Sequence, residues 1–225
     1  IGAFEDENII SSVIPLAFTW GVGAGAASFA WIWVNPDSLE IKKGTQIELE
    51  VSQEVVATQS QNVAAIVPGM DQADSIILIC GHYDHLGGVG NDLWFPGAND
   101  NASGIAMMLD LANWFTKNPQ GRTLAFVAFG GEEAGLKGSR DFVYQPPAGL
   151  HPDNISFVMN MDLMGSGEKG ATIVNASVFE REFGLLKSIN DQNEYLPLIK
   201  MRGKAANSDH HHYTDQELRE LIEQS

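Results

Sequence analysis

Short, unbroken apolar segments recur along the chain, and each ends at a proline, a glycine or an acidic residue. Runs of this kind predict strands that are buried on both faces, as in a sheet covered by helices. The predicted strands are Asn62–Val67, Ile76–Cys80, Thr123–Phe129 and Ile155–Met161. An earlier segment, Thr45–Val51, alternates apolar and polar residues and therefore predicts a strand with one solvated face.

Segments with a helical repeat lie between and after these strands. In Ser103–Phe115 the apolar residues fall on one stripe at the spacing of an α-helix. Helical patterns also cover Glu133–Tyr144, Val178–Ile189 and the terminal segment Thr214–Gln224. Strands that alternate with helices predict a three-layer α/β/α domain with a mostly parallel central sheet. We assign this domain to residues 61–225.

Residues 1–60 are predicted to form a separate, short N-terminal element that contains β-structure. Within it, Val13–Val34 is apolar and long enough to cross a bilayer. Pro15 and several glycines interrupt this run, however, and no positive charge precedes it. We therefore favour a buried helix–strand pair over a membrane span or a displaced signal segment.

The composition indicates a folded, strongly acidic protein. Hydrophobic residues make up 44% and charged residues 19% of the 225 positions, which argues against a disordered or fibrous chain. Asp and Glu number 29 against 13 Lys and Arg, a net charge of −16. This charge repels nucleic acids and anionic membranes, and it favours metal cations or substrates with a free amine. Cys80 is the only cysteine, which excludes a disulfide framework and a cysteine-rich zinc finger.

Polar clusters fall at the ends of the predicted strands, where open α/β sheets form their sites. G-H-Y-D-H, G-G-E-E-A-G-L and N-M-D-L-M-G each follow one apolar strand. P-G-A-N-D-N-A-S-G precedes the first long helix, and S-D-H-H-H-Y belongs to a late loop. These clusters contribute His82, Asp84, Asp100, Glu132, Glu133, Asp162 and His210.

Carboxylates gathered at one sheet edge repel one another, and a divalent cation removes the cost of burying them unpaired. Two histidines and three carboxylates suit Zn²⁺, with Co²⁺ or Mn²⁺ as alternatives. Each residue also has a structural explanation: a histidine can simply donate a hydrogen bond, and Asp100 can cap the helix that follows. The coincidence of five clusters at strand ends or helix starts favours the metal site.

Two spacings suggest a division of roles. Side chains of adjacent residues in extended backbone point in opposite directions, so one of Glu132 and Glu133 can bind metal while the other acts as general base. His82 and Asp84 are two residues apart and share a face. The Asp84 carboxylate can therefore accept the second imidazole N–H of His82 and fix its tautomer.

The ordered set of five motifs resembles the co-catalytic dinuclear zinc aminopeptidase family, which also contains glutamate carboxypeptidases and glutaminyl cyclases. The resemblance covers about Asn62–Tyr213. It implies two zinc ions per chain. The implied ligands are His82 and Asp162 for one ion, Glu133 and His210 for the other, and Asp100 as the bridge.

The same resemblance implies catalytic roles for two further residues. Glu132 matches the family's general base, and Asp84 matches the acid behind the first zinc histidine. The remaining histidines of the motifs, His85, His211 and His212, match no ligand position and are left out of the predicted site.

The activity implied is hydrolysis of the N-terminal residue from peptides with a free N-terminus, by a water that two zinc ions activate. Three alternatives stay open: a glutaminyl cyclase-like enzyme with one zinc ion, a carboxypeptidase for acidic peptides, and a non-catalytic, receptor-like homologue. We expect a secreted protein in an extracellular or periplasmic location, although no signal peptide is visible in the chain.

The chain departs from the family pattern at both ends. Family members usually continue beyond the second zinc histidine with another strand, whereas here Tyr213 leads directly into a short predicted helix. Substrate-binding residues are therefore not carried over. The N-terminal element resembles part of the protease-associated insert of some members, in abbreviated form.

Overall fold

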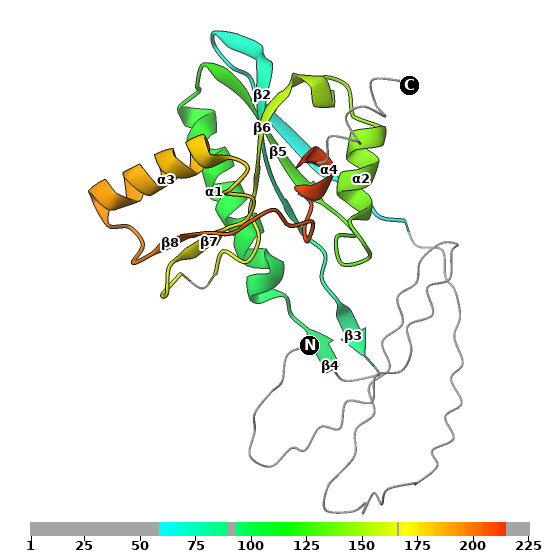
Figure 1. Cartoon of the computed structure of the whole chain (residues 1–225). Helices are drawn as coiled ribbons and strands as arrows, with labels where there is room; N and C mark the ends of the chain where they lie inside the picture. The colour runs from blue at the N-terminus through cyan, green and yellow to red at the C-terminus, as the bar shows by residue number, and fades with distance from the viewer. Residues whose placement is uncertain (1–58, 90–92, 166, 215–225) are drawn as a thin grey trace, which may run out of the picture. The chain divides into compact units, whose positions relative to one another are not determined.

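The structure is a computed structural model that describes residues 59–89, 93–165 and 167–214 (Figure 1). Nearly all of the predicted N-terminal element, including Val13–Val34 and the predicted strand Thr45–Val51, lies outside these residues, as does nearly all of the predicted terminal helix. Among the described residues, no helix combines the length and apolar character needed to cross a bilayer. The division into an N-terminal element and a zinc exopeptidase domain stays a prediction.

Strands and helices alternate along the described part of the chain, as the sequence predicts. The strands are β1 (Val63–Val67), β2 (Gln72–His82), β3 (Gly87–Val89), β4 (Leu93–Phe95), β5 (Arg122–Phe129), β6 (Ile155–Asn160), β7 (Ala171–Ile173) and β8 (Ile199–Met201). The helices are α1 (Ser103–Lys117), α2 (Lys137–Tyr144), α3 (Glu180–Asn193) and α4 (His211–Thr214). Two short turns, η1 (Ala98–Ala102) and η2 (Pro152–Asn154), precede α1 and β6.

The main sheet has four strands in the order β1-β5-β2-β6. β2 pairs in parallel with both β5 and β6, and β1 runs antiparallel to β5 at one edge. The described residues also form two separate two-stranded sheets, the antiparallel β3–β4 hairpin and the parallel pair β7–β8. The predicted α/β domain with a mostly parallel central sheet is confirmed.

Helices pack on both faces of the sheet, so that the domain has three layers (Figure 1). Because side chains alternate along a strand, Ile76, Leu78 and Cys80 of β2 face the side of α2 and α4. Ile77 and Ile79 face the opposite side, where they pack with the apolar residues of α1. The unbroken apolar run in β2 thus supplies both cores at once.

Cys80 lies at the centre of this arrangement, on the strand between β5 and β6. Its side chain is completely buried, and its Sγ lies 3.5 Å from Oδ1 of Asn160. Burial and the charge of Asp209 raise the pKa of the Cys80 thiol well above its ordinary value. The thiol is therefore a packed core group.

Two expectations about the elements were wrong in part. Burial on both faces holds for β2 and β5, but the edge strands β1 and β6 expose Val63 (55%) and Met159 (43%). The helix predicted from Glu133 begins only at Lys137. Gly135 and Leu136 both have a positive φ, which a right-handed α-helix does not contain, so the helix can begin only after them.

Candidate metal centre

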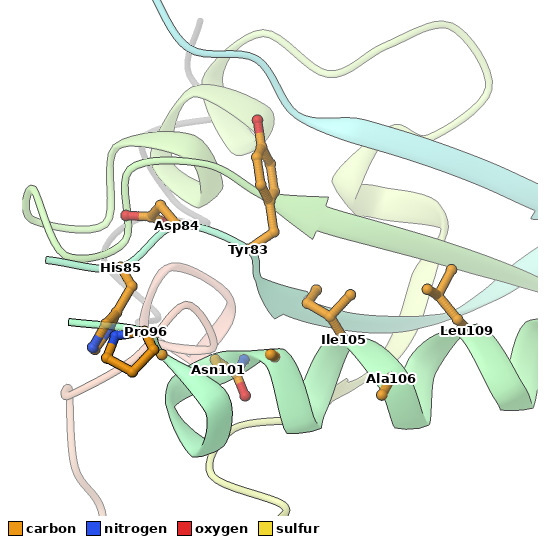
Figure 2. Close-up of a pocket in the computed structure, with 10 residues that line it drawn as sticks. Tyr83, Asp84, His85, Pro96, Asn101, Ile105, Ala106 and Leu109 are labelled. Carbon is orange, nitrogen blue, oxygen red and sulfur yellow. The ribbon is translucent and has the colours of Figure 1, made fainter. Parts of the chain in front are cut away.

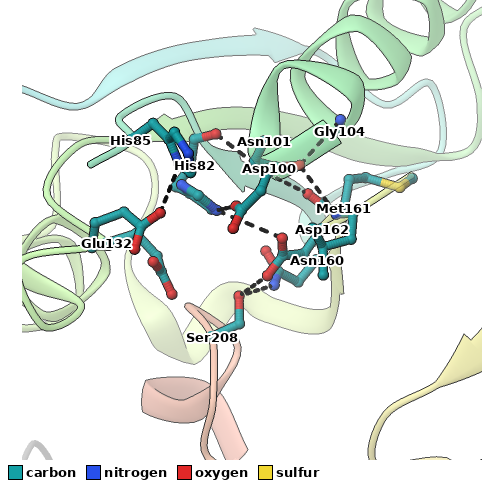
Figure 3. A network of polar contacts seen from close by, with 12 residues as sticks. His82, His85, Asp100, Asn101, Gly104, Glu132, Asn160, Met161, Asp162 and Ser208 are labelled. Atoms are coloured by element: carbon teal, nitrogen blue, oxygen red, sulfur yellow. Dashed lines mark hydrogen bonds and ion pairs between the residues drawn. The ribbon is translucent and has the colours of Figure 1, made fainter. Parts of the chain in front are cut away.

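The parallel strands bring polar side chains to one edge of the sheet (Figure 3). His82 is the last residue of β2, and Asp162 lies just beyond the end of β6. Glu132 follows β5 in the same way, and Asp100 comes from η1, where its backbone (φ −112°, ψ 92°) is not helical. Side chains from four separate chain segments therefore converge, as the strand-end positions predict.

His82, Asp100 and Asp162 form the first group of ligating side chains. The Nε2 atom of His82 lies 3.1 Å from Oδ1 of Asp100 and 3.6 Å from Oδ1 of Asp162. One ligand atom from each residue lies within 4.8 Å of the other two. His82 is buried, and the two carboxylates are partly exposed. This group is compact enough to hold one metal ion.

A second group consists of His85, Asp100 and Glu133, with ligand atoms again within 4.8 Å of one another. Asp100 belongs to both groups, so the two groups meet at its carboxylate. His85 was excluded from the predicted site because it matched no ligand position. Its place in the loop directly after β2, three residues beyond His82, is the signal that could have identified it.

Among the described residues, His210 belongs to neither of these two groups. Instead, its Nε2 lies 3.0 Å from the carbonyl oxygen of Ala205. Burial lowers the pKa of His210 below its ordinary value, which favours the neutral imidazole. Its assignment as a ligand of the second ion stays a prediction.

The Asp84 carboxylate lies within ion-pair distance of His82, as expected, but makes its hydrogen bonds elsewhere. Nδ1 of His82 lies 3.1 Å from the backbone carbonyl oxygen of Asp84, whereas the nearer carboxylate oxygen is 3.7 Å away. The carboxylate accepts hydrogen bonds from the backbone N–H groups of Glu132 (3.0 Å) and Glu133 (3.1 Å). The chain leaves the sheet at this point, which directs the Asp84 side chain toward the end of β5.

Burial and the clustered carboxylates shift several pKa values. Burial alone would lower the pKa of His82, but Asp162 and Glu132 outweigh it and raise that pKa to about 9. Burial raises the pKa of Glu132 to about 7, with Asp209 adding to the effect and His82 opposing it. The pKa of Asp162 is lowered, because His82 and a hydrogen bond from Ser208 outweigh burial. The edge is thus a site of strong negative potential.

Comparison with known proteins agrees with this geometry. Residues 62–221, more than half of the chain, match the model described as Peptidase family M28. The chain belongs to peptidase family M28.

The relatives of this M28 chain include enzymes with zinc in their names. A "Probable zinc metalloprotease" from Pyricularia oryzae is 33% identical over 164 residues, which are 68% of this chain and 32% of that protein. The solved structure of a zinc aminopeptidase from Bacillus subtilis is 25% identical, with a TM-score of 0.53 over 66% of this chain and 36% of the other. An Acidobacteriales bacterium glutaminyl cyclase, 20% identical, shares the fold, with a TM-score of 0.56 over 66% of this chain and 53% of the other. The M28 chain thus spans about a third of the curated relative's length.

The donors of the M28 chain fit zinc, which prefers nitrogen and carboxylate ligands. One observation tests this fit: Oδ1 of Asp162 is buried and accepts no hydrogen bond among the described residues. It lies 3.6 Å from Nε2 of His82, too far for a hydrogen bond. A buried carboxylate oxygen with only a long ion pair to His82 and no hydrogen bond is costly, and a cation between Asp162 and His82 would satisfy it.

Asn101 holds the segments that carry the first group, and sequence reasoning missed it. Its side chain is 1% exposed and donates hydrogen bonds to the carbonyl oxygens of His82 (3.3 Å) and Met161 (2.9 Å). Its Oδ1 accepts from the backbone N–H groups of Gly104 (3.1 Å) and Leu163 (3.3 Å). One amide therefore ties the ends of β2 and β6 to the start of α1 (Figure 3).

A pocket of about 350 Å³ adjoins the second group (Figure 2). Ile105, Ala106 and Leu109 of α1 line its apolar wall, and His85 and Asp84 lie at its polar end. The site therefore combines charged ligands with an adjacent apolar surface.

Asp209 is a further acid near this edge, completely buried beside the predicted ligand His210. Its carboxylate oxygens make no hydrogen bond of standard geometry among the described residues, although Ser139 lies near enough to oppose the rise in its pKa. Burial raises the pKa of Asp209 to about 6, with Asp84 and Asp162 adding to the effect. Its charge adds to the negative potential that a cation would relieve.

Proposed function

We propose that this M28 chain carries the catalytic centre of a zinc-dependent exopeptidase that hydrolyses the N-terminal residue from peptides. One observation supports this most strongly: two groups of possible ligand atoms share Asp100, with His82 and Asp162 in one group and His85 and Glu133 in the other. A shared carboxylate is typical of sites in which two metal ions act on the same reacting atoms.

In this proposal, His82 and Asp162 would hold the first ion, Glu133 and His210 would hold the second, and Asp100 would serve both. Co²⁺ or Mn²⁺ would suit the same donors. When bound, the zinc ions would lower the pKa of a coordinated water and polarise the scissile carbonyl group.

Glu132 is the residue that we assign to proton transfer. Its carboxylate can both accept and release a proton, and burial raises its pKa above the ordinary value when no metal is bound. Glu132 takes the proton of the attacking water and later gives it to the leaving amine. Asp84 supports this role, because its carboxylate holds the backbone N–H of Glu132 at 3.0 Å.

The proposed substrate is a peptide with a free N-terminus. The net charge of −16 and the carboxylates at the sheet edge attract a cationic amine. Nucleic acids are disfavoured by the same charge. An extracellular or periplasmic location stays a prediction.

A glutaminyl cyclase-like reaction with a single zinc ion is the second candidate. It is favoured by one observation, that His210 lies outside both groups of ligand atoms among the described residues. The fold shared with the Acidobacteriales glutaminyl cyclase is compatible with it. Metal stoichiometry separates the two candidates, because one tightly bound zinc ion per chain favours the cyclase and two favour hydrolysis.

The decisive experiment is a panel of fluorogenic aminoacyl substrates, assayed with and without chelator and alongside their N-acetylated forms. The proposal expects hydrolysis that chelator abolishes, that zinc restores, and that N-acetylation prevents. Cleavage of acidic C-terminal residues instead would indicate a carboxypeptidase. Bound zinc without any hydrolysis would indicate a receptor-like homologue and contradict the proposal.

A further inference from the structure

His85 lies where it can control the side chain of Glu133. Its Nδ1 atom is 2.8 Å from Oε1 of Glu133, and the two side chains are 21% and 22% exposed. A carboxylate oxygen can only accept a hydrogen bond, so Nδ1 of His85 carries the proton. The contact is thus a hydrogen bond donated by His85, which leaves the other carboxylate oxygen of Glu133 available to a metal ion.

The surroundings of His85 hold its ring in this position. Phe95 packs edge-on against it, with ring centroids 6.5 Å apart and an interplanar angle of 76°. On another side, Gly97 approaches so closely that a Cβ atom at this position would lie 3.0 Å from Cγ of His85. Gly97 also has a φ of +65°, a conformation that glycine adopts without strain. The imidazole therefore occupies a space that its neighbours define.

Glu133 is consequently fixed at two points by one short loop. The Asp84 carboxylate holds its backbone N–H at 3.1 Å, and His85 holds its side-chain oxygen. Metal-binding carboxylates are commonly oriented in this way by a hydrogen bond from outside the ligand set. The H-Y-D-H segment thus supplies a ligand, a backbone support and a side-chain support in sequence.

We propose that His85 is a positioning residue that orients Glu133 for binding the second metal ion. This inference rests on the proposed two-ion function. Distance distinguishes the role from that of a ligand: a tetrahedral zinc ion would separate a bound nitrogen and oxygen by about 3.3 Å. The observed 2.8 Å is the length of a direct hydrogen bond.

The test compares His85→Ala with His85→Asn in the full chain. The Asn amide nitrogen occupies the place of Nδ1 and can donate to Glu133, but it is a poor zinc ligand. His151→Ala is the control, because His151 is exposed and pairs with Asp153 rather than with the site. Zinc affinities are measured by competition with a chromophoric chelator, Co²⁺ absorption spectra report the coordination, and circular dichroism verifies folding.

We expect His85→Ala to weaken the second ion by about 10–100-fold and to leave the first unchanged. His85→Asn and His151→Ala should bind both ions as the wild type does. An unchanged affinity for the second ion in His85→Ala would overturn this inference and leave the proposed two-ion function standing. Equal losses in both His85 variants, with an altered Co²⁺ spectrum in His85→Asn, would overturn it in favour of a ligand role. A wild type that binds fewer than two ions would contradict the two-ion function itself.

Discussion

Replacing Asn101 with alanine should lower the free energy of unfolding more than the same change at an exposed asparagine, because the buried Asn101 amide makes four hydrogen bonds. The substitution leaves two carbonyl oxygens and two N–H groups without their partner. Each buried polar group left unpaired costs about 1–3 kcal/mol, and two of the four bonds are long. We therefore expect the free energy of unfolding to fall by about 3–6 kcal/mol.

The assay is urea unfolding in the presence of chelator, so that metal affinity does not contribute. Asn118→Ala is the matched control, since Asn118 is exposed and its side chain makes one hydrogen bond, to Trp114; its loss should be about 1 kcal/mol or less. Asn101→Asp retains the shape but turns an oxygen toward the carbonyls of His82 and Met161, so it should also destabilise. A loss for Asn101→Ala no larger than that of Asn118→Ala would refute the reasoning.

Three further predictions concern the ligands and the charges around them. Glu132→Gln should keep its zinc content but lose turnover by at least about 10²-fold. Glu133→Gln should instead lose affinity for one of the two ions. Zinc analysis and steady-state kinetics of both variants check this, and the opposite pair of results would exchange the two roles. Asp100→Ala should lose zinc from both positions because it belongs to both ligand groups, and wild-type zinc content in this variant would exclude a shared carboxylate. In chelator, stability should fall as pH rises from about 4 to 8. The pKa of Glu132 is raised to about 7 and that of Asp209 to about 6, so both favour the protonated folded state, and this advantage is lost as pH rises through these values. The raised pKa of His82 adds to the fall, and the lowered pKa of His210 opposes it. Thermal melts across this range should show a shallower fall for Asp209→Asn, and a melting temperature that rises with pH would contradict the reasoning.

The sequence was sufficient to predict that His82 and Asp162 lie at the same edge, because parallel strands end at a common edge. His82 is the last residue of β2 and Asp162 lies just beyond β6, and the structure shows that these two strands are parallel neighbours. The direction of β1 could not be predicted in this way. An apolar run such as Val63–Val67 reads the same for a parallel and an antiparallel neighbour, so only packing determines the choice.

The sequence was less informative where loops decide which way a side chain points. The Asp84 carboxylate was expected to accept a hydrogen bond from His82; it lies 3.7 Å from the ring as an ion pair, and its hydrogen bonds come from two backbone N–H groups. Asn101 was missed for the same reason, whereas His85 was left out because it matched no ligand position. Their contacts depend on turns at residues such as Gly97, whose positive φ no periodic pattern records.

The buried thiol of Cys80 makes the centre of the sheet accessible to kinetic measurement. Because the chain has no other cysteine, a thiol reagent that labels the protein reports on this one position. The reagent can react only when β2 opens away from its neighbours, since the side chain is completely buried. His82 lies two residues further along the same strand, so an ion that joins it to Asp100 and Asp162 should slow this opening. The labelling rate with and without zinc would then measure how strongly the metal centre restrains the core.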